Sequence, residues 1–318
     1  MSFTSSPSEQ DRPSVEELNE ILRAAAAGEH SAARAARLSD LDASSGRELW
    51  RLWQRIPVDA RRYLVREMVE LSESNVELNF ARVLRMALDD PDAEVRALAV
   101  SGLWENESNL LLDQFLDLLA VEPEPVVRET LAQALGQFAY RCALAEVDGD
   151  RSERVRQALL DLFRSNESIG VRRRALESLA YFDDDEEVEE LIAEAYDSLH
   201  HDLRVSALFA MGRNLADRWL EPVLEGLEDE EAELRFEAAR ASGEFGDQRA
   251  VDLLLNLVAD EDREVQFAAI TALGQIGGKL AVQALGRLAR SDDEPIAELA
   301  REAQTQALQV NDPLRPGL

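Results

Sequence analysis

The stretch "AELRFEAARASG" (residues 232–243) decides the fold, because five further segments of the chain repeat its pattern. They are "AEVRALAVSGLW" (93–104), "PVVRETLAQALG" (125–136), "IGVRRRALESLA" (169–180), "HDLRVSALFAMG" (201–212) and "REVQFAAITALG" (263–274). Each has an aliphatic residue, then Arg or Gln, then small or aliphatic residues at helical spacing. The Arg or Gln position, called the marker below, is occupied by Arg96, Arg128, Arg172, Arg204, Arg235 and Gln266, at steps of 32, 44, 32, 31 and 31 residues. This internal period predicts a repeat protein.

A second amphipathic segment lies between successive markers, as in "LLLDQFLDLLAVE" (110–122), "VEELIAEAYDSL" (188–199) and "AVDLLLNLVADED" (250–262). Its apolar residues also follow the helical period. The repeat is therefore two helices with short connections. A pair this small cannot bury its apolar face alone, so it must stack on its neighbours.

The shared pattern D-x-x-V-R-x-x-A-x-x-A-L-G, seen in "DAEVRALAVSGLW" (92–104) and "DREVQFAAITALG" (262–274), resembles the HEAT-repeat families. It is most similar to the short HEAT-like repeats also found in bacterial phycobilisome-lyase subunits. The resemblance covers about residues 76–305. It implies an all-α fold, an α-α superhelix of about six two-helix repeats, and it does not imply lyase activity.

The rest of the chain is expected to flank this array. Residues 14–75 are predicted to form an N-terminal helical cap that contains a degenerate repeat, since solenoid ends need atypical elements to cover their apolar faces. Residues 1–13 are expected to be disordered, and 306–318 to form a C-terminal tail. The 44-residue step contains "FAYRCALAEVDGDRSE" (138–153), which predicts a longer loop or an extended helix.

Acidic residues precede the marker by four positions in several repeats, at Asp92, Glu124, Glu231 and Asp262. A carboxylate at the start of a helix accepts hydrogen bonds from free backbone N–H groups. The same acids lie one turn from the marker arginine and are within its reach. An acid of the adjacent repeat could pair with that arginine equally well, and the spacing leaves both pairings open.

The glycines of "TALGQIGGKLAVQAL" (271–285) raise the question of a phosphate-binding loop. The G-x-x-x-x-G-K-[ST] spacing is not met and no strand is predicted before the segment. Gly274 instead aligns with Gly136, Gly212 and Gly243, and Gly277 falls where Gly246 falls one repeat earlier. The glycines are therefore interpreted as part of the repeat, with a left-handed helix C-cap at Gly246 and, one repeat later, at Gly277 and Gly278.

The amino-acid composition argues against several classes of function. Lys and Arg number 34 against 64 Asp and Glu, a net charge of −30 that opposes nucleic acids and anionic membranes. The single cysteine, Cys142, excludes an intrachain disulfide. The N-terminus lacks a signal-peptide pattern, so a cytoplasmic protein is expected. With three histidines and no H-E-x-x-H or C-x-x-C motif, neither a metal site, a cofactor nor a catalytic residue is predicted.

One face of the second helices, called the ridge below, is the candidate binding surface. Positions one, five and nine residues after the marker face away from the core at 100° per residue, on the side expected to be concave. The predicted ridge residues are Arg173, Glu177, Tyr181, Phe209, Arg213, Phe236, Arg240 and Phe267. The phenylalanines either close the packing between repeats or form a groove beside the arginines, as interface hot spots do.

We therefore predict a non-enzymatic scaffold or adaptor that binds a protein or peptide along the concave face, as a monomer or weak homo-oligomer. The alternative is a regulatory or catalytic-partner subunit of a lyase-type enzyme that acts on a protein substrate. A nucleic-acid-binding repeat protein is a third, disfavoured alternative because of the charge.

Overall fold

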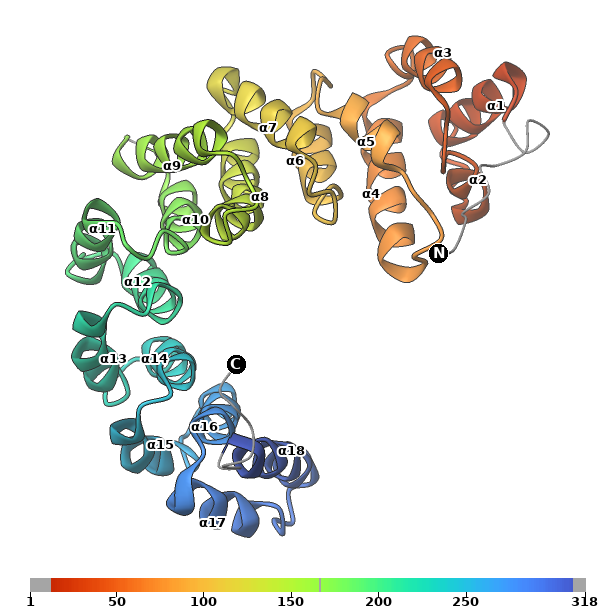
Figure 1. The fold of residues 1–318 in the computed structure, drawn as a ribbon. Coiled ribbons are helices and arrows are strands. Elements are labelled where there is room, and N and C mark those ends of the chain that lie inside the picture. Colours follow the sequence, from red (N-terminus) through yellow and green to blue (C-terminus); the bar gives the residue numbers. More distant parts are fainter. Residues whose placement is uncertain (1–12, 166, 311–318) are drawn as a thin grey trace. The chain divides into compact units, whose positions relative to one another are not determined.

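The computed structural model describes residues 13–165 and 167–310, and every regular element in these ranges is a helix (Figure 1). The first nine α-helices are α1 (Val15–Ala26), α2 (Ala32–Ala36), α3 (Ala43–Trp53), α4 (Val58–Ser74), α5 (Ala81–Ala87), α6 (Ala93–Ser101), α7 (Asn109–Val121), α8 (Pro125–Ala143) and α9 (Gly149–Arg164). The others are α10 (Ile169–Leu179), α11 (Glu186–Tyr196), α12 (His201–Asn214), α13 (Leu220–Gly226), α14 (Ala232–Phe245), α15 (Val251–Leu257), α16 (Arg263–Ile276), α17 (Gly278–Leu288) and α18 (Glu294–Val310). Two 3₁₀ turns, η2 (Asp217–Trp219) and η3 (Gln248–Ala250), lead into α13 and α15. The predicted all-α fold is confirmed.

The chain divides into two compact units. The first comprises residues up to 138 together with 147–158, and the second comprises 139–146 together with 159–318. Helices α8 and α9 contribute to both units.

In the first unit, α3 and α4 occupy the positions of a repeat. α4 packs on α6 and α3 packs on α5, while α1 and α2 both pack on α4. Leu49, Trp53 and Leu64 are almost completely buried in this packing. The α3–α4 pair therefore packs on the α5–α6 pair that follows it.

In the second unit, the second helices of successive pairs pack directly on one another. α10, α12, α14, α16 and α18 contact in succession, and each of α11, α13 and α15 packs on the helix that follows it. Figure 1 shows α12, α14 and α16 in one row and α11, α13 and α15 in a second. The aliphatic residue before each marker is buried, with Leu203, Leu234 and Val265 all at most 1% exposed. Burial of these apolar side chains drives the stacking.

Glycine at the end of the repeat pattern allows this close stacking. A Cβ at Gly212 would lie 2.8 Å from the Cα of Ala241 in α14, and one at Gly274 would lie 2.9 Å from the Cα of Ala303 in α18. Both obstacles are backbone atoms, which cannot move aside as a flexible side chain can. The recurring glycine is therefore a packing residue between neighbouring repeats.

The helix ends follow the sequence except at Glu231, Gly277 and Gly278. The Glu231 side chain accepts no capping hydrogen bond at the start of α14, and Gly278 is the first residue of α17. Asp92 and Asp262 are the N-caps of α6 and α16, and their carboxylates accept from backbone N–H groups. Gly246 ends α14 in the left-handed conformation (φ 66°, ψ 14°) as predicted. Gly277 has a positive φ of 67° but an extended ψ of −151°, because it both ends α16 and begins α17. The left-handed cap predicted at Gly277 is therefore wrong in ψ.

The 44-residue step is taken up by helix length. α8 has 19 residues and α9 has 16, so the segment 138–153 extends two helices and leaves a short loop between them. At the other end, α18 packs on α16 and α17 and continues to Val310, past the predicted array boundary at 305. Residues 1–12 and 311–318, where a disordered N-terminus and a tail were predicted, lie outside the described residues.

Candidate partner-binding surface

The markers lie at the junctions between successive helix pairs. In the first unit, Arg96 on α6 donates from Nη1 to the carbonyl of Asp90, six residues earlier, at 2.8 Å. Its Nε and Nη2 donate to the carboxylate of Glu122, which follows α7, at 2.7 and 2.6 Å. The side chains of Arg96 and Glu122 are only 11% and 1% exposed. A buried, bidentate ion pair thus connects two neighbouring repeats.

The same arrangement recurs in the second unit. Arg235 donates to the carbonyl of Asp229 at 2.9 Å and, through Nε and Nη2, to the carboxylate of Asp260 at 2.8 and 2.9 Å. The hydrogen bonds from Arg235 lower the pKa of Asp260, and burial opposes them. Arg204 pairs with Asp229 at 3.2 Å, and Gln266 keeps the carbonyl contact alone, to Asp260, at 2.6 Å. The acid therefore comes from the next repeat, which resolves the alternative left open by the sequence.

The two remaining markers contact backbone carbonyls in, or just after, the helix that precedes them in the same pair. Arg128 donates from Nη1 to the carbonyls of Leu119 and Glu122, at 3.2 and 3.1 Å. Arg172 donates from Nε to the carbonyl of Phe163 at 3.0 Å, and its guanidinium lies 4.7 Å from the centre of the Phe163 ring. All six markers thus satisfy groups within the repeat stack, which is a structural role.

A residue equivalent to a marker, which the sequence did not indicate, lies on α4. Arg61 on α4 pairs with Asp90 at 2.9 Å, and the indole Nε1 of Trp53 donates to the same carboxylate at 2.7 Å. The Asp90 side chain is fully buried. The repeat pattern is weak around Arg61, and only the helical periodicity of its segment pointed to a repeat.

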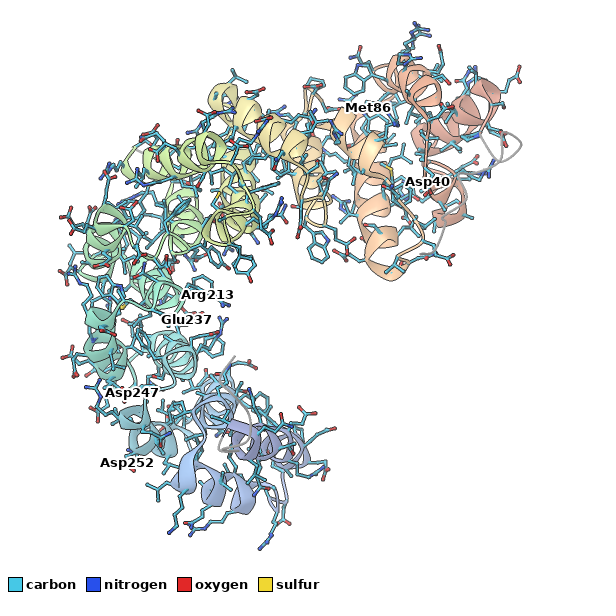
Figure 2. All side chains as sticks on the ribbon, in the orientation of Figure 1. Asp40, Met86, Arg213, Glu237, Asp247 and Asp252 are labelled. Carbon is cyan, nitrogen blue, oxygen red and sulfur yellow. The ribbon has the colours of Figure 1, made fainter. Side chains whose placement is uncertain are left out.

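Seven of the predicted ridge residues lie on α10, α12, α14 and α16, and Tyr181 lies just after α10. All eight are half-buried. Figure 2 shows Arg213 and Glu237 on one side of the α12–α14 layer, and Asp247 and Asp252 on the other. The ridge therefore occupies the side of these helices away from α13 and α15.

Aromatic rings and guanidinium groups alternate along the ridge. The ring of Phe209 has two arginine neighbours, Arg213 from its own helix and Arg240 from α14, each with its guanidinium 5.6 Å from the ring centre. Arg240 also lies 5.7 Å from the centre of the Phe236 ring. These cation–π contacts join α12 to α14 and leave the rings partly accessible. The phenylalanines are thus neither core residues nor fully exposed.

A polar network continues the ridge onto α10. Arg173 donates from Nε to the hydroxyl of Ser206 at 3.0 Å, and Ser206 donates to Glu177 at 2.7 Å. Arg174 pairs with Glu177 at 2.8 Å. Ser206 is buried between α10 and α12 and was not predicted, because it lies two residues after its marker rather than one or five.

Glu237, also two residues after its marker, is a second residue that the sequence did not indicate. Its side chain is 14% exposed and pairs with Arg240 at 3.2 Å. Burial raises the pKa of Glu237, the Glu177 carboxylate raises it further, and Arg240 and Arg173 oppose the shift. The ridge therefore contains a carboxyl group whose charged form is disfavoured.

The ends of the ridge are less densely connected. Tyr181 packs edge-on against Tyr140 of α8, with ring centres 5.5 Å apart, and Tyr140 is 50% exposed. Phe267 lies under the guanidinium of Arg263 at 5.2 Å. Arg213 is 3.6 Å from Glu244. The structure brings Arg173, Glu177, Phe209, Arg213, Phe236 and Arg240 together and places Tyr181 and Phe267 at the two ends.

Within residues 13–165 and 167–310, no three His, Cys, Asp or Glu side chains are grouped so that they could hold a metal ion. In the same residues, no helix is long and apolar enough to cross a membrane. His201 links α12 to the start of α14, with its ring nitrogens 2.5 Å from Glu231 and 2.6 Å from Glu233.

Comparison with known proteins gives a family match and several structural matches. The family model for HEAT repeats matches residues 80–180 and 220–308, more than half of the chain. No curated protein matches the sequence. A chain of the CpcE–CpcF complex of phycocyanin lyase from Nostoc sp. PCC7120 superposes with a TM-score of 0.52 at 19% identity, over 72% of this chain and 91% of that one.

Yeast importin-β (Kap95p) superposes with a TM-score of 0.58 at 14% identity, over 96% of this chain. A Kap95 complex with Nup1 gives 0.56 at 14% identity. The chain spans 47% of the length of these importin chains. At these identities the structural matches establish the fold alone.

Proposed function

The chain belongs to the HEAT-repeat family, and we propose that it is a protein-interaction scaffold that docks a segment of a partner protein on the ridge. The observation that carries this proposal is Phe209, whose ring is held between Arg213 and Arg240 and remains partly accessible. Aromatic and arginine side chains dominate the binding energy of protein interfaces. Their side chains here are already ordered by contacts between helices, which lowers the entropy lost on binding.

The chemistry of the ridge suggests what such a partner presents. Arg213 and Arg240 can pair with carboxylates, and the rings of Phe209 and Phe236 offer apolar contacts. The partner segment would therefore combine acidic and apolar side chains. We place this activity in the cytoplasm, without a catalytic step, and expect the free protein to be a monomer or a weak homo-oligomer.

The alternative is a subunit that assists an enzyme acting on a protein substrate. The observation that favours it is the polar network of Arg173, Ser206 and Glu177 next to Glu237, a carboxyl group with a raised pKa. Such groups occur at sites of proton transfer as well as in structural networks. A purified complex of this chain with its partner that modifies a protein only when Glu237 is present would select this alternative.

The scaffold proposal can be tested by comparing two charge-reversed proteins. Arg213→Glu with Arg240→Glu alters the ridge, and Arg218→Glu with Arg249→Glu makes the same change in charge near α13 and α15, at side chains 53% and 56% exposed. Each protein is immobilised and used to capture partners from cells of the native organism, with quantification by mass spectrometry. We expect the ridge variant alone to lose a defined set of partners. Equal capture by both variants would contradict the proposal.

A further inference from the structure

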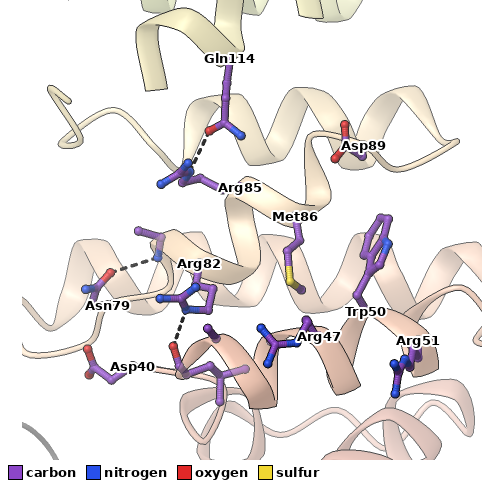
Figure 3. Close-up of a pocket in the computed structure, with 14 residues that line it drawn as sticks. Asp40, Arg47, Trp50, Arg51, Asn79, Arg82, Arg85, Met86, Asp89 and Gln114 are labelled. Carbon is purple, nitrogen blue, oxygen red and sulfur yellow. Dashed lines mark hydrogen bonds between the residues drawn. The ribbon is translucent and has the colours of Figure 1, made fainter. Parts of the chain in front are cut away.

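A pocket in the first unit combines features that the ridge does not use. It has a volume of about 810 Å³ and lies between α3, α5 and α7 (Figure 3). This volume is within the range of pockets that hold ligands or peptide side chains. No sequence pattern predicts this pocket, because its lining residues come from α3 in the degenerate part of the chain and from α5 and α7, and they are separated by up to 74 positions, from Asp40 to Gln114.

The pocket is cationic in a strongly acidic chain. Four arginines line it, Arg47 and Arg51 from α3 and Arg82 and Arg85 from α5, against the two carboxylates of Asp40 and Asp89. The whole chain has 34 basic and 64 acidic residues. A local excess of positive charge in such a chain attracts a short anionic group to this place.

Arg82 and Arg85 are each held in position by a hydrogen bond from their Nε atom. Arg82 donates from Nε to the carbonyl of Leu41 at 2.6 Å, and Arg85 donates from Nε to the side-chain oxygen of Gln114 at 2.7 Å. The stem of Arg82 also lies against Gly46, where a Cβ would come within 2.9 Å of its Cδ. Fixing Nε orients the guanidinium while its terminal nitrogens still carry donors. This arrangement pre-organises the pair for a planar acceptor such as a carboxylate.

Arg47 and the apolar wall complete the pocket. Arg47 is exposed, and the structure records no ion pair between it and another described residue. Trp50 and Met86 are half-buried, and Figure 3 shows both beside Arg47. The pocket thus presents guanidinium groups next to an aromatic ring and a flexible thioether, which suits an apolar side chain of an incoming segment.

We propose that this pocket binds an acidic segment of a partner protein, whose carboxylates pair with Arg47, Arg82 and Arg85 while an apolar side chain packs on Trp50 and Met86. Asp40, Asp89 and Asn79 at its rim accept hydrogen bonds and suit the backbone N–H groups of a peptide. Trp50 and Met86 give the pocket an apolar wall that a polyphosphate would not use, so a peptide with an apolar side chain fits the pocket better than a polyphosphate does. The site lies in a different unit from the ridge and is independent of the proposed function there.

The test uses the full chain and a fluorescein-labelled peptide, Glu-Glu-Leu-Glu-Glu-Leu, with fluorescence anisotropy as the readout. Its counterpart with Gln in place of every Glu tests the need for carboxylates. We expect the acidic peptide to bind at least about tenfold more tightly than the Gln peptide. We also expect its affinity to fall as salt is raised, since the contacts are partly exposed.

The variants locate the site. Arg47→Glu should weaken binding by about tenfold or more, and since Arg47 has no recorded ion pair the variant is expected to fold, as circular dichroism can verify. Arg55→Glu is the matched control, an exposed arginine just after α3 that does not line the pocket. Equal binding of both peptides, equal loss in the Arg47 and Arg55 variants, or displacement of the peptide by inorganic pyrophosphate at lower concentrations than by unlabelled peptide would overturn the proposal.

Discussion

Arginines at the repeat junctions and arginines on the ridge project from the same helices but contact different groups. Arg235, a junction arginine on α14, contacts the carbonyl of Asp229 and the nearly buried carboxylate of Asp260 in the next repeat. Arg240, five residues later on the same helix, contacts the faces of Phe209 and Phe236. The side chain of Arg235 is 16% exposed and that of Arg240 is 41% exposed. A junction arginine has its donors occupied by the fold, and a ridge arginine keeps much of its guanidinium accessible to a partner.

The carboxyl groups of the two regions differ in the same way. At the junction, the hydrogen bonds from Arg235 lower the pKa of Asp260. On the ridge, burial raises the pKa of Glu237 despite its contact with Arg240. The charge of Asp260 therefore stabilises the fold, as expected of a structural contact, whereas the charge of Glu237 does not. A carboxyl group with a raised pKa is more typical of a functional surface.

The largest expected effect is at a junction. Arg96→Ala would leave the Glu122 side chain, 1% exposed, without its cation. Removing one partner of a buried ion pair costs about 3–5 kcal/mol, and we expect a loss of this size in the free energy of unfolding, measured with urea. Arg66→Ala is the control, because Arg66 is 52% exposed and pairs with Glu94 at the surface, and such pairs contribute about 0–1 kcal/mol. Similar losses in the two variants would remove the distinction between buried and exposed pairs.

An intermediate effect is expected from Arg235→Gln, which copies the natural marker Gln266. At neutral pH the free energy of unfolding of the variant should be about 1–3 kcal/mol lower than that of the wild type, because the hydrogen bonds to the charged Asp260 are gone. The pKa of Asp260 is lowered in the folded protein, so its contribution is complete above the ordinary value near pH 4 and is lost as the pH falls through the folded value. Urea unfolding at several pH values should therefore show the difference between the wild type and the variant shrinking in acid. A difference that does not change with pH would show that the pair does not stabilise the junction through charge.

The smallest effect is expected from Glu237→Gln on the ridge, and this substitution should raise the stability of the protein instead of lowering it. The raised pKa of Glu237 means that the folded protein binds the proton more tightly than the unfolded chain does, so stability falls as the pH rises from about 4.5 through the folded value. Glu237→Gln removes this charge, and above that window it should be more stable than the wild type by on the order of 0.5 kcal/mol. Thermal melts across the window should show the advantage of the variant growing with pH. A variant that is less stable than the wild type at neutral pH would indicate that the Glu237–Arg240 pair is a structural contact.

Much of the fold could be predicted because each repeat carries its own signals. The alternation of apolar residues predicts the helices, the period predicts the stacking, and the aligned Gly212 and Gly274 are found where neighbouring helices come closest. The HEAT-repeat match confirms this interpretation. The conformation at Gly277 was missed because one residue serves two helix ends, which local propensity does not reveal.

Less of the candidate sites could be predicted. Ser206 and Glu237 reach the ridge from marker-plus-two positions, which straight helical geometry alone does not assign to that face. Tyr140 belongs to the ridge only because α8 is extended by the long step. The arginine pocket depends on α3 and α5 being neighbours, and no repeat pattern in the sequence marks that pair.

The amino-acid sequence by itself determined the helices, their pairing and the residues that face the core, because these follow from the spacing of apolar side chains along each helix and from the short links between helices. Only the tertiary structure decided which groups the marker arginines contact, how far the ridge rings are covered, and where the arginines of the pocket gather. Those properties depend on distances between residues about 25 or more positions apart, such as Arg235 and Asp260. These properties follow from burial and charge, which act through space, and the order of residues along the chain does not reveal them.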